Sequence, residues 1–452
     1  MNFNRHIYKY LLKWKNKTRR KPLILRGARQ VGKTTLAKSF AKEYTYSIFL
    51  NLEKQSDRDY FLEFDEMTQL CDVLLLLNNV PTDKKHETLL FIDEIQESPK
   101  AIQQLRYFYE RVPELHVIAA GSLLEIALKE VKSFPVGRVE FAYLYPLNFT
   151  EFLEALGHQE ALKQLHQVPV APFAHSILLS LFHEYALVGG LPEAVAVYLE
   201  NRFLADLPPI YESIWRSYID DVSKYAKNTA ESKIIKHIMS VAPKYVDQRI
   251  SFQNFGNSNY RSREISEAFY SLNAAKIIQL VYPTTSLENP IEGDLKKSPR
   301  LQFLDTGIIN HSLHIQAELL AMKDLSSAYK GAIIPHLITQ ELISLFETTP
   351  YQPHFWVREK RQSSAEVDLV WSHAPYLIPI EIKSGKTGTL RSLHQFIDAS
   401  SHHFAVRIYG GKLSIEEHKT IAGKPFTLLN LPYYLGTKLP DYVKYLVEGY
   451  NN

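Results

Sequence analysis

The stretch KPLILRGARQVGKTTLAKSFAKEY, residues 21–44, predicts an apolar strand, a glycine-bounded loop and a helix, in that order. Gly27 and the run Gly32-Lys33-Thr34 fit the pattern G-x-x-x-x-G-K-[ST] of a phosphate-binding loop. Glycines let successive backbone N–H groups curl around phosphate oxygens, and the following helix points its positive end at them. The stretch therefore predicts a nucleotide site in an α/β domain.

The loop also predicts its cofactors, which are ATP and Mg²⁺. We expect Lys33 to reach the β- and γ-phosphates and the Thr34 hydroxyl to bind Mg²⁺. The candidate cofactor-binding residues are Gly27, Ala28, Arg29, Gln30, Val31, Gly32, Lys33, Thr34 and Thr35. The alternative is a glycine turn with a solvated lysine, and the strand–loop–helix context argues against it.

A second motif that could serve the same nucleotide is ETLLFIDEIQ, residues 87–96, which predicts a buried strand ending in Asp93-Glu94. Asp93 would hold the magnesium shell, and Glu94 would orient and deprotonate the attacking water. An acidic pair after a strand also often caps the next helix. Downstream of a phosphate-binding loop, the pair is the expected Walker B segment.

Two further residues are candidates for the same reaction. Ser122 ends the strand LHVIAAGS (115–122), and it would lie beside the γ-phosphate if this strand runs between the two Walker strands. Its alternative role is the N-cap of a helix over LLEIALKE (123–130). Arg138 precedes an alternating strand, where it could meet the nucleotide of a neighbouring subunit in a homo-oligomer. The alternative is a surface arginine next to a turn glycine.

Five segments together resemble the prokaryotic AAA-type ATPases that carry a C-terminal DUF4143 domain. These segments are GARQVGKTTL (27–36), LLFIDEIQ (89–96), IAAGS (118–122), PVGRVEFAYLYPLNFTEFL (135–153) and VGGLPEAV (188–195). The resemblance covers nearly the whole chain and implies a P-loop α/β sandwich of the additional-strand class. Family members often have threonine where Ala120 stands, a departure that weakens the sensor role of Ser122.

The middle of the chain is predicted to be helical and then mixed. Apolar residues recur at three- and four-residue spacing from about 150 to 230, and GGLP (189–192) interrupts them. This region could form a lid over the nucleotide or pack as ordinary helices. Residues 231–290 then show the helix–helix–strand pattern of a winged helix, in which Arg261 and Arg263 could meet DNA. Winged helices are also common packing modules.

The C-terminal stretch AEVDLVWSHAPYLIPIEIKSGK, residues 365–386, sets two carboxylates and a lysine among apolar residues. A hairpin would bring Asp368 close to Glu381, and Glu381 shares a strand face with Lys383. Two carboxylates suit Mg²⁺, which polarises a phosphodiester, and Lys383 would stabilise charge or position a water. The alternative is an ordinary hairpin with charged residues on its solvated face.

This region resembles the PD-(D/E)xK nuclease core, to which the DUF4143 family is similar. The resemblance implies that Asp368 and Glu381 bind Mg²⁺, with Lys383 as the catalytic lysine and Gln395 as a polar helper on the next helix. Relatives tend to have a glutamate where Pro335 stands, and the nearest acid, Glu341, lies almost two turns further on. A nuclease-like fold that binds nucleic acid or another partner without cutting therefore stays an open alternative.

Composition narrows the class of protein. The net charge of +3 is only mildly basic, and one cysteine excludes an internal disulfide framework. The longest aliphatic run, VLLLLNNV (73–80), is far shorter than the roughly 20 residues of a membrane span. The first residues lack the features of a secretion signal. We expect a cytoplasmic protein without a membrane partner.

The sequence thus predicts an α/β multidomain ATPase coupled to a nuclease-like domain that binds nucleic acid, with DNA favoured over RNA. The alternative function is a nucleotide-dependent switch or scaffold whose inactive nuclease-like domain recognises a partner. The expected domains are a P-loop AAA-type ATPase domain (1–148), a helical lid (149–230), a winged-helix-like module (231–290) and a nuclease-like DUF4143 domain (300–452).

Overall fold

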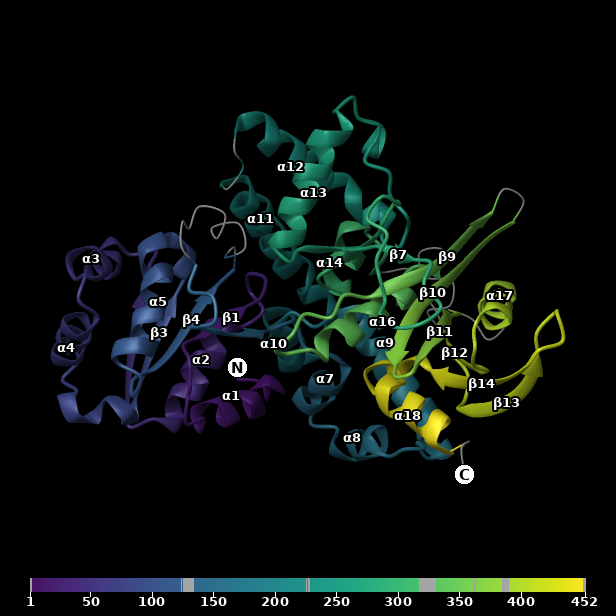
Figure 1. Ribbon diagram of the computed structural model, residues 1–452, viewed down its shortest axis with the longest axis horizontal. Coiled ribbons are helices and arrows are strands. Elements are labelled where there is room, and N and C mark those ends of the chain that lie inside the picture. Colours follow the sequence, from purple (N-terminus) through teal and green to yellow (C-terminus); the bar gives the residue numbers. More distant parts are fainter. Residues whose placement is uncertain are drawn as a thin grey trace. The chain divides into compact units, whose positions relative to one another are not determined.

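The chain divides into two units, and Figure 1 shows the helices and strands of both. The computed structural model describes residues 2–122, 124, 134–224, 226, 228–316, 331–360, 363–383 and 390–449. Unit 1 comprises Met1–Tyr145, Tyr270–Ile277 and Phe346–Pro350. Unit 2 comprises Pro146–Phe269, Ile278–Leu345 and Tyr351–Asn452. The four-domain division expected from the sequence stays a prediction.

Unit 1 is built on a five-stranded parallel sheet with the strand order β2-β3-β4-β1-β5. The strands are β1 (Leu23–Arg26), β2 (Tyr46–Asn51), β3 (Thr88–Asp93), β4 (His116–Gly121) and β5 (Glu140–Tyr143). Every residue of β3 before Asp93 is buried, as in a parallel strand covered on both faces. Strand β4 lies between β1 and β3, which confirms the predicted strand between the two Walker strands.

Helices and apolar side chains cover this sheet. The helices are α1 (Ile7–Lys15), α2 (Lys33–Phe40), α3 (Gln55–Glu63), α4 (Met67–Leu77) and α5 (Pro99–Arg111). Leucines of α4 and α5 pack in one core with Ile24, Leu90 and Ile92 of the strands. Helix α5 begins where the Ser98 hydroxyl accepts a hydrogen bond from Ala101 N. The predicted helix over 123–130 lies outside the described residues, apart from Leu124.

Unit 2 begins with helices, as the apolar spacing predicts. They are α7 (Phe149–Leu156), α8 (Gln159–His166), α9 (His175–Val188), α10 (Pro192–Asn201), α11 (Pro208–Lys224) and α12 (Thr229–Val241). Asn148 and Glu151 form a capping box at the start of α7, and Gly157 ends it in the left-handed conformation. The predicted break at GGLP is confirmed, with Pro192 in the first turn of α10. No described helix combines the length and the apolar composition that a membrane span requires.

A helix and a two-stranded ribbon follow α12. They are α13 (Ser262–Ala274), β6 (Ile278–Val281) and β8 (Arg300–Phe303), and β6 pairs with β8 antiparallel. The apolar side chains Ile265, Phe269 and Leu272, whose spacing puts them on one face of α13, are all buried. The expected order of helix, helix and strand is present, and the winged-helix interpretation stays a prediction.

The C-terminal part of unit 2 forms a seven-stranded mixed sheet with the order β13-β14-β12-β11-β10-β9-β7. Its strands are β7 (Pro283–Thr284), β9 (His354–Lys360), β10 (Ser363–His373), β11 (Tyr376–Ile382), β12 (Phe404–Tyr409), β13 (Ser414–Lys419) and β14 (Pro425–Pro432). The helices of this part are α14 (Thr306–Ser312), α16 (Ile333–Ser344), α17 (Arg391–Ala399) and α18 (Leu439–Gly449). Strands β10 and β11 form the predicted antiparallel hairpin.

A buried carboxylate joins the GGLP loop to the end of β8. Asp305 Oδ2 accepts a hydrogen bond from Gly190 N at 2.6 Å, and Oδ1 accepts one from Ile308 N at 3.2 Å. A Cβ atom on Gly190 would lie 2.0 Å from the carbonyl oxygen of Leu147, so no other residue fits there. Burial raises the pKa of Asp305 to about 6, although these N–H groups oppose the rise. The loop and the strand end therefore form one packed unit.

Candidate functional site

Lys33, the first residue of α2, lies inside the phosphate-binding loop. Only 6% of the residue is exposed, and its Nζ donates to the carbonyl oxygens of Gly27 at 3.0 Å and Ala28 at 2.7 Å. Burial lowers the pKa of Lys33 to about 8, and the nearby Glu94 and Asp93 carboxylates oppose this change. The loop backbone thus holds the ammonium group at the place where the sequence predicts phosphate contact.

The shape of the loop depends on its glycines. Gly27 and Gly32 have φ angles of 156° and 94°, which other residues rarely adopt. A Cβ atom on Gly27 would lie 2.3 Å from the carbonyl oxygen of Leu144. The loop is also held by a residue that sequence reasoning missed, since buried Arg5 donates to the carbonyl oxygens of Val31 at 3.0 Å and Tyr145 at 2.5 Å. No local sequence motif predicts this contact, because Arg5 is far from Tyr145 along the chain.

Thr34 and Asp93 meet at the carboxyl edge of the parallel sheet. The Thr34 hydroxyl donates to Asp93 Oδ2 at 2.7 Å, and Asp93 Oδ1 accepts from Glu94 N at 3.1 Å. A hydroxyl and a carboxylate placed together provide the hard oxygen ligands that Mg²⁺ prefers. The residues at this position therefore fit the predicted magnesium ion.

Glu94 is held by a neighbour that the sequence did not single out. Gln96 Nε2 donates to Glu94 Oε2 at 2.5 Å, and the backbone of Glu94 is left-handed with a φ of 50°. Burial raises the pKa of Glu94, partly opposed by Gln96 and by the charge of Lys33. A Cβ atom on Gly121 would lie 2.4 Å from Gln96 Oε1, so this glycine makes room for the amide.

Ser122 lies on the same edge of the sheet as the loop. It follows β4, whose last residue, Gly121, is paired with Arg26 at the end of β1. Ser122 is buried, with 8% of its surface exposed. Because the carboxyl ends of parallel strands meet at one edge, β1, β3 and β4 bring together the loop, Asp93 and Ser122. Its role as an N-cap concerns a helix outside the described residues.

Arg138 lies at the opposite edge of this sheet. It comes two residues before β5, whose first residue, Glu140, is paired with Leu23 at the start of β1. The phosphate-binding loop follows the other end of β1. Arg138 Nε forms an ion pair with Glu110 Oε1 of α5 at 2.7 Å, and both side chains are partly exposed. Arg138 is therefore not part of the site built by its own sheet.

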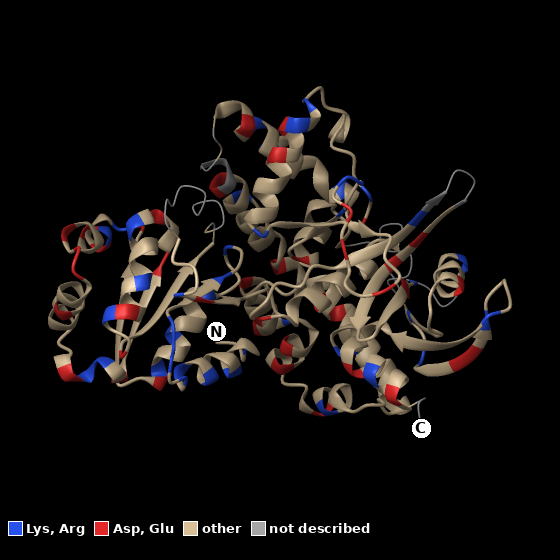
Figure 2. Ribbon diagram, in the orientation of Figure 1, with Lys and Arg blue, Asp and Glu red and all other residues tan. Residues whose placement is uncertain are grey.

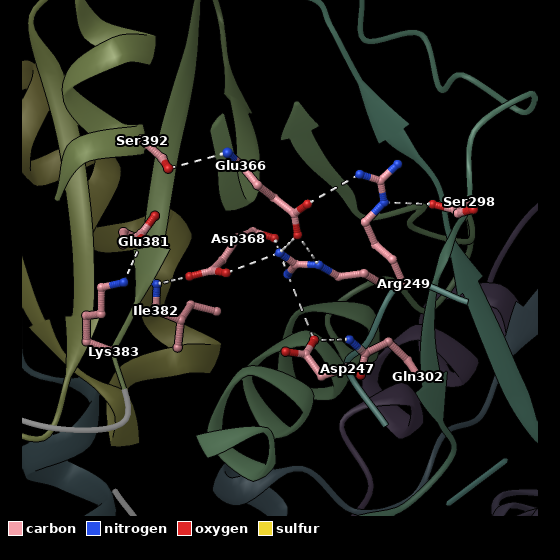
Figure 3. A network of polar contacts seen from close by, with 11 residues as sticks. Asp247, Arg249, Ser298, Gln302, Glu366, Asp368, Glu381, Ile382, Lys383 and Ser392 are labelled. Atoms are coloured by element: carbon pink, nitrogen blue, oxygen red, sulfur yellow. Dashed lines mark hydrogen bonds and ion pairs between the residues drawn. The ribbon is translucent and has the colours of Figure 1, made fainter. Parts of the chain in front are cut away.

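The second candidate site lies on the β10–β11 hairpin (Figure 3). Asp368 Oδ2 accepts a hydrogen bond from Ile382 N at 2.8 Å, and Asp368 Oδ1 accepts one from Arg300 Nη2 at 3.3 Å. Glu381 Oε1 is 2.5 Å from Lys383 Nζ. Burial and the neighbouring Asp368 raise the pKa of Glu381 to about 7, whereas Lys383 opposes the rise. The three predicted residues are thus neighbours.

Arg300 of β8, which sequence reasoning missed, supplies the central cation of this site. Its Nε donates to Glu366 Oε1 at 3.0 Å, and its Nη2 contacts the same oxygen. Nη1 lies 3.3 Å from the carbonyl oxygen of Asp368 and 3.9 Å from Asp247 Oδ1. The guanidinium carbon is 4.6 Å from the ring centre of Phe355. These acids raise the pKa of Arg300, so the group stays charged.

The side chains at the hairpin do not fit the divalent ion that the resemblance implies. Both oxygens of Asp368 already have hydrogen-bond donors, and Lys383 takes one oxygen of Glu381. The other oxygen of Glu381 lacks a hydrogen-bond partner among the described residues. One carboxylate oxygen is fewer than such an ion takes from a two-carboxylate site. Within the described parts of the chain, no three His, Cys, Asp or Glu side chains are grouped as metal ligands.

The two other residues considered for this site have different partners. Glu341 is buried, and it accepts hydrogen bonds from Phe149 N at 3.1 Å and from the Tyr185 hydroxyl at 2.8 Å. Gln395 Oε1 accepts a hydrogen bond from Arg358 Nη2 of β9. Glu341 therefore helps to hold α16 against the start of α7 and does not replace the missing glutamate.

Glu341→Gln is expected to remove part of the pH dependence of stability. Burial raises the pKa of Glu341 from 4.5 to about 8, so the folded protein keeps a proton that the unfolded chain releases in this window. Stability then falls as the pH rises, by roughly 3 kcal/mol for this group between pH 5.5 and 8. In urea unfolding, the stability of Glu341→Gln relative to the wild type should be higher at pH 8 than at pH 5.5.

The exposed Glu160, paired with Lys163 on α8, provides the control for this measurement. Glu160→Gln should leave the pH dependence of the unfolding midpoint as it is in the wild type, because an exposed pair contributes less than about 1 kcal/mol. Equal pH slopes for the wild type and Glu341→Gln would contradict the assignment of a buried, protonated carboxyl at this position.

Comparison with protein families gives three consecutive matches. Residues 19–153 match the model of an AAA domain, residues 179–319 match a domain of unknown function, DUF8612, and residues 330–429 match DUF4143. No curated protein matches the chain. The DUF8612 match begins within α9 and extends beyond α14, so it includes the predicted winged-helix segment and the part of the predicted lid from residue 179 onward.

Two solved structures that match this chain have low sequence identity to it and low TM-scores. The Walker-type ATPase PABY2304 of Pyrococcus abyssi is 14% identical over 69% of this chain and 96% of its own, with a TM-score of 0.44. The ORC1 protein of Aeropyrum pernix, solved in complex with DNA, is 12% identical over 70% of this chain and 91% of its own, with a TM-score of 0.27. No functional conclusion follows from similarities this low. The family matches do establish the domains: this chain carries an AAA domain followed by a C-terminal domain of the DUF4143 family.

Proposed function

We propose that the protein hydrolyses ATP in its AAA domain and that the nucleotide state controls nucleic-acid binding by its C-terminal domain, with DNA as the favoured partner. The observation that carries the ATPase proposal is the contact between Thr34 and Asp93, 2.7 Å apart, next to a lysine enclosed by a glycine loop. These residues come from the two Walker segments, 59 positions apart.

Each residue of this site has a proposed role. Lys33 binds the β- and γ-phosphates, and the loop N–H groups of residues 27–35 surround the phosphate oxygens. Thr34 and Asp93 hold Mg²⁺, which when bound neutralises charge on the phosphates. Glu94 orients the attacking water and accepts its proton, and Gln96 fixes the position of that carboxylate. Ser122 contacts the γ-phosphate from the end of β4.

Arg138 is proposed to act on the nucleotide of a neighbouring subunit in a homo-oligomer. Its position at the opposite edge of the sheet supports action in trans, since its own nucleotide site lies beyond the length of β1. Mixing experiments test this proposal. Arg138→Ala subunits should restore turnover when mixed with Lys33→Ala subunits, because hybrid interfaces combine an intact loop with an intact arginine. Absence of recovery, with oligomers present, contradicts the proposal.

Glu94→Gln is expected to lower ATP turnover by roughly 10²–10⁴-fold while ATP binding is retained, because it removes a general base and leaves the phosphate contacts in place. Phosphate release and the affinity for a fluorescent ATP analogue are the measurements. The exposed Glu97, three residues on, provides the control, and Glu97→Gln should keep both properties. Loss of ATP binding in Glu94→Gln would contradict the proposed role.

Nucleic-acid binding by the C-terminal domain rests on the nuclease-like hairpin and its charges. Figure 2 shows a basic segment toward the far end of the β9–β10 pair and acidic residues further along it. Arg358 of β9 is partly buried and donates to Gln395 Oε1, and arginine side chains commonly contact phosphates. DNA should bind with a salt-dependent affinity and should raise ATP turnover. Fluorescence anisotropy that shows no binding to DNA or RNA would reject this part of the proposal.

A second candidate function is a nucleotide-dependent switch whose nuclease-like domain recognises a partner without cutting. The contacts of Arg300 with Asp368 favour this candidate, since a paired carboxylate is poorly placed to bind a metal ion. The two functions differ in one measurement. Metal-dependent cleavage that disappears in Asp368→Ala and Lys383→Ala supports a nuclease, whereas binding without cleavage supports the switch.

A further inference from the structure

We propose that Arg300 is the resident cation of the carboxylate cluster formed by Asp247, Glu366 and Asp368, and that it takes the place of a divalent metal ion. In this proposal the cluster is a closed ion-pair network that joins β8 to the β10–β11 hairpin. It concerns the C-terminal domain and goes beyond the ATPase, because the contacts involve no residue of the nucleotide site.

The guanidinium contacts all three acids of the cluster. Arg300 Nε and Nη2 both reach Glu366 Oε1, and Nη2 also reaches Asp368 Oδ1 at 3.3 Å. Asp247 Oδ1 lies 3.9 Å from Nη1. Such a planar cation with several donors suits carboxylates that approach from different directions. Three acids from two separate segments thus share one positive charge.

Burial makes this arrangement hard to exchange for an ion from solution. Only 9% of the Arg300 side chain is exposed, and its guanidinium stacks over Phe355. The Arg300 backbone is fixed by the pairing of β8 with β6 and by a bridge to Arg249. Arg249 adds a second cation, 3.7 Å from Glu366 Oε2. Both oxygens of Glu366 therefore already face arginine.

A metal ion at Asp368 would compete directly with Arg300. Such an ion lies about 2.1 Å from its carboxylate ligands. Asp368 Oδ1 already has Nη2 at 3.3 Å, and Oδ2 holds the backbone of β11 through Ile382 N. Two cations next to one carboxylate oxygen repel each other in a buried place. Metal binding at Asp368 is therefore expected to weaken its pairing with Arg300, and the pairing to weaken metal binding.

The network continues from Asp247 to α16 through Gln302. Gln302 Nε2 donates to Asp247 Oδ1 at 2.7 Å, and His336 Nδ1 of α16 lies 2.5 Å from Gln302 Oε1. Contacts thus run from α16 through β8 to Arg300 and on to Asp368. This continuity assigns the acids a structural role, which holds the segment after α12 on the C-terminal sheet.

The test is Mn²⁺ binding to the full chain without nucleotide, measured by electron paramagnetic resonance. We compare the wild type, Arg300→Gln, Asp368→Asn and the double variant Arg300→Gln/Asp368→Asn, because ions held at Thr34 and Asp93 are common to all four. The wild type and Asp368→Asn should bind equally below about 1 mM Mn²⁺. Arg300→Gln should gain a site, and the double variant should lose it.

Two other outcomes overturn the proposal. One is Mn²⁺ binding by the wild type that Asp368→Asn abolishes, and the other is a folded Arg300→Gln without any added site. Circular dichroism establishes that the variants are folded. If Arg300→Gln does not fold, the comparison of the wild type with Asp368→Asn still decides, and Arg300→Lys should fold without a new site because it keeps the charge.

The same protein variants distinguish a failure of this proposal from a failure of the proposed ATPase activity. ATP turnover is measured at a fixed Mg²⁺ concentration. If no turnover is found, the proposed ATPase activity fails, and the Mn²⁺-binding result is unaffected. DNA cleavage with Mn²⁺ by the wild type, lost in Asp368→Asn, would contradict a resident arginine. Arg216→Gln is the matched arginine control, since its side chain is 75% exposed and pairs with Glu212 on the same helix. It should bind Mn²⁺ as the wild type does.

Discussion

Lys33→Ala is expected to lower ATP turnover by roughly 10³-fold or more, because it removes a cation placed against the charge that develops on the transferred phosphoryl group. The loop holds Lys33 Nζ through the carbonyl oxygens of Gly27 and Ala28, which keeps the ammonium group inside the phosphate-binding loop. Alanine leaves these buried carbonyls without their donor and the phosphates without their charge. Phosphate release at saturating ATP measures the effect.

Lys38 provides the control for this substitution. It lies on the same helix, α2, in the last turn, and it is exposed. Lys38→Ala changes the net charge by the same amount, and it should keep turnover within about twofold of the wild type, because exposed charges contribute little. Equal losses in both variants would show that the overall charge of α2, rather than a specific phosphate contact, limits the reaction.

The nucleotide site could be predicted because its information is local. Strand, glycine loop and helix follow one another within 24 residues, and Asp93 ends a strand in which residues 89–92 are all apolar. Parallel strands place their carboxyl ends at one edge of a sheet, so Thr34 and Asp93 had to meet once β4 lay between β1 and β3. The parallel arrangement of the strands, and not the spacing of Thr34 and Asp93 along the chain, brings these two residues together.

The partners of the C-terminal carboxylates could not be predicted in this way. The hairpin itself follows from alternation and a short turn, and it correctly placed Asp368 near Glu381. Arg300 lies 66 and 68 residues from its acids, in the segment RLQF, which predicts only an apolar strand. Its contacts depend on how β8 lies on the sheet. Arg5 escaped prediction for the same reason.

A local feature can be predicted from the sequence even where its contact with a distant segment cannot, as the GGLP loop and Asp305 show. The break at GGLP was expected from its glycines and proline, whereas Asp305 was not singled out. Nothing in that pattern indicates that the Asp305 carboxylate caps the loop 115 residues away. The demand for glycine at 190 comes from the carbonyl of Leu147, which lies in a third segment. Such requirements appear only when three segments pack together.

Asp305→Ala is expected to destabilise unit 2 by about 4 kcal/mol. Asp305 accepts hydrogen bonds from the backbone N–H groups of Gly190 and Ile308, both in the same buried cluster. Alanine leaves these donors unsatisfied, at about 1–3 kcal/mol for each group that water does not reach. The midpoint of thermal unfolding should fall by roughly 10 °C. Asp305→Asn keeps one carbonyl acceptor and should show a smaller loss.

Asp441 provides the matched control, because it lies in the first turn of α18 and its side chain is 56% exposed. Asp441→Ala should cost less than about 1 kcal/mol, since solvent screens its interactions with the helix dipole and with Lys438. Hydrogen exchange locates the effect, because the amides of Gly190 and Ile308 should lose protection in Asp305→Ala and keep it in Asp441→Ala. If those two amides stay protected when Asp305 is alanine, another acceptor holds the GGLP loop, and the carboxylate is not what joins it to β8.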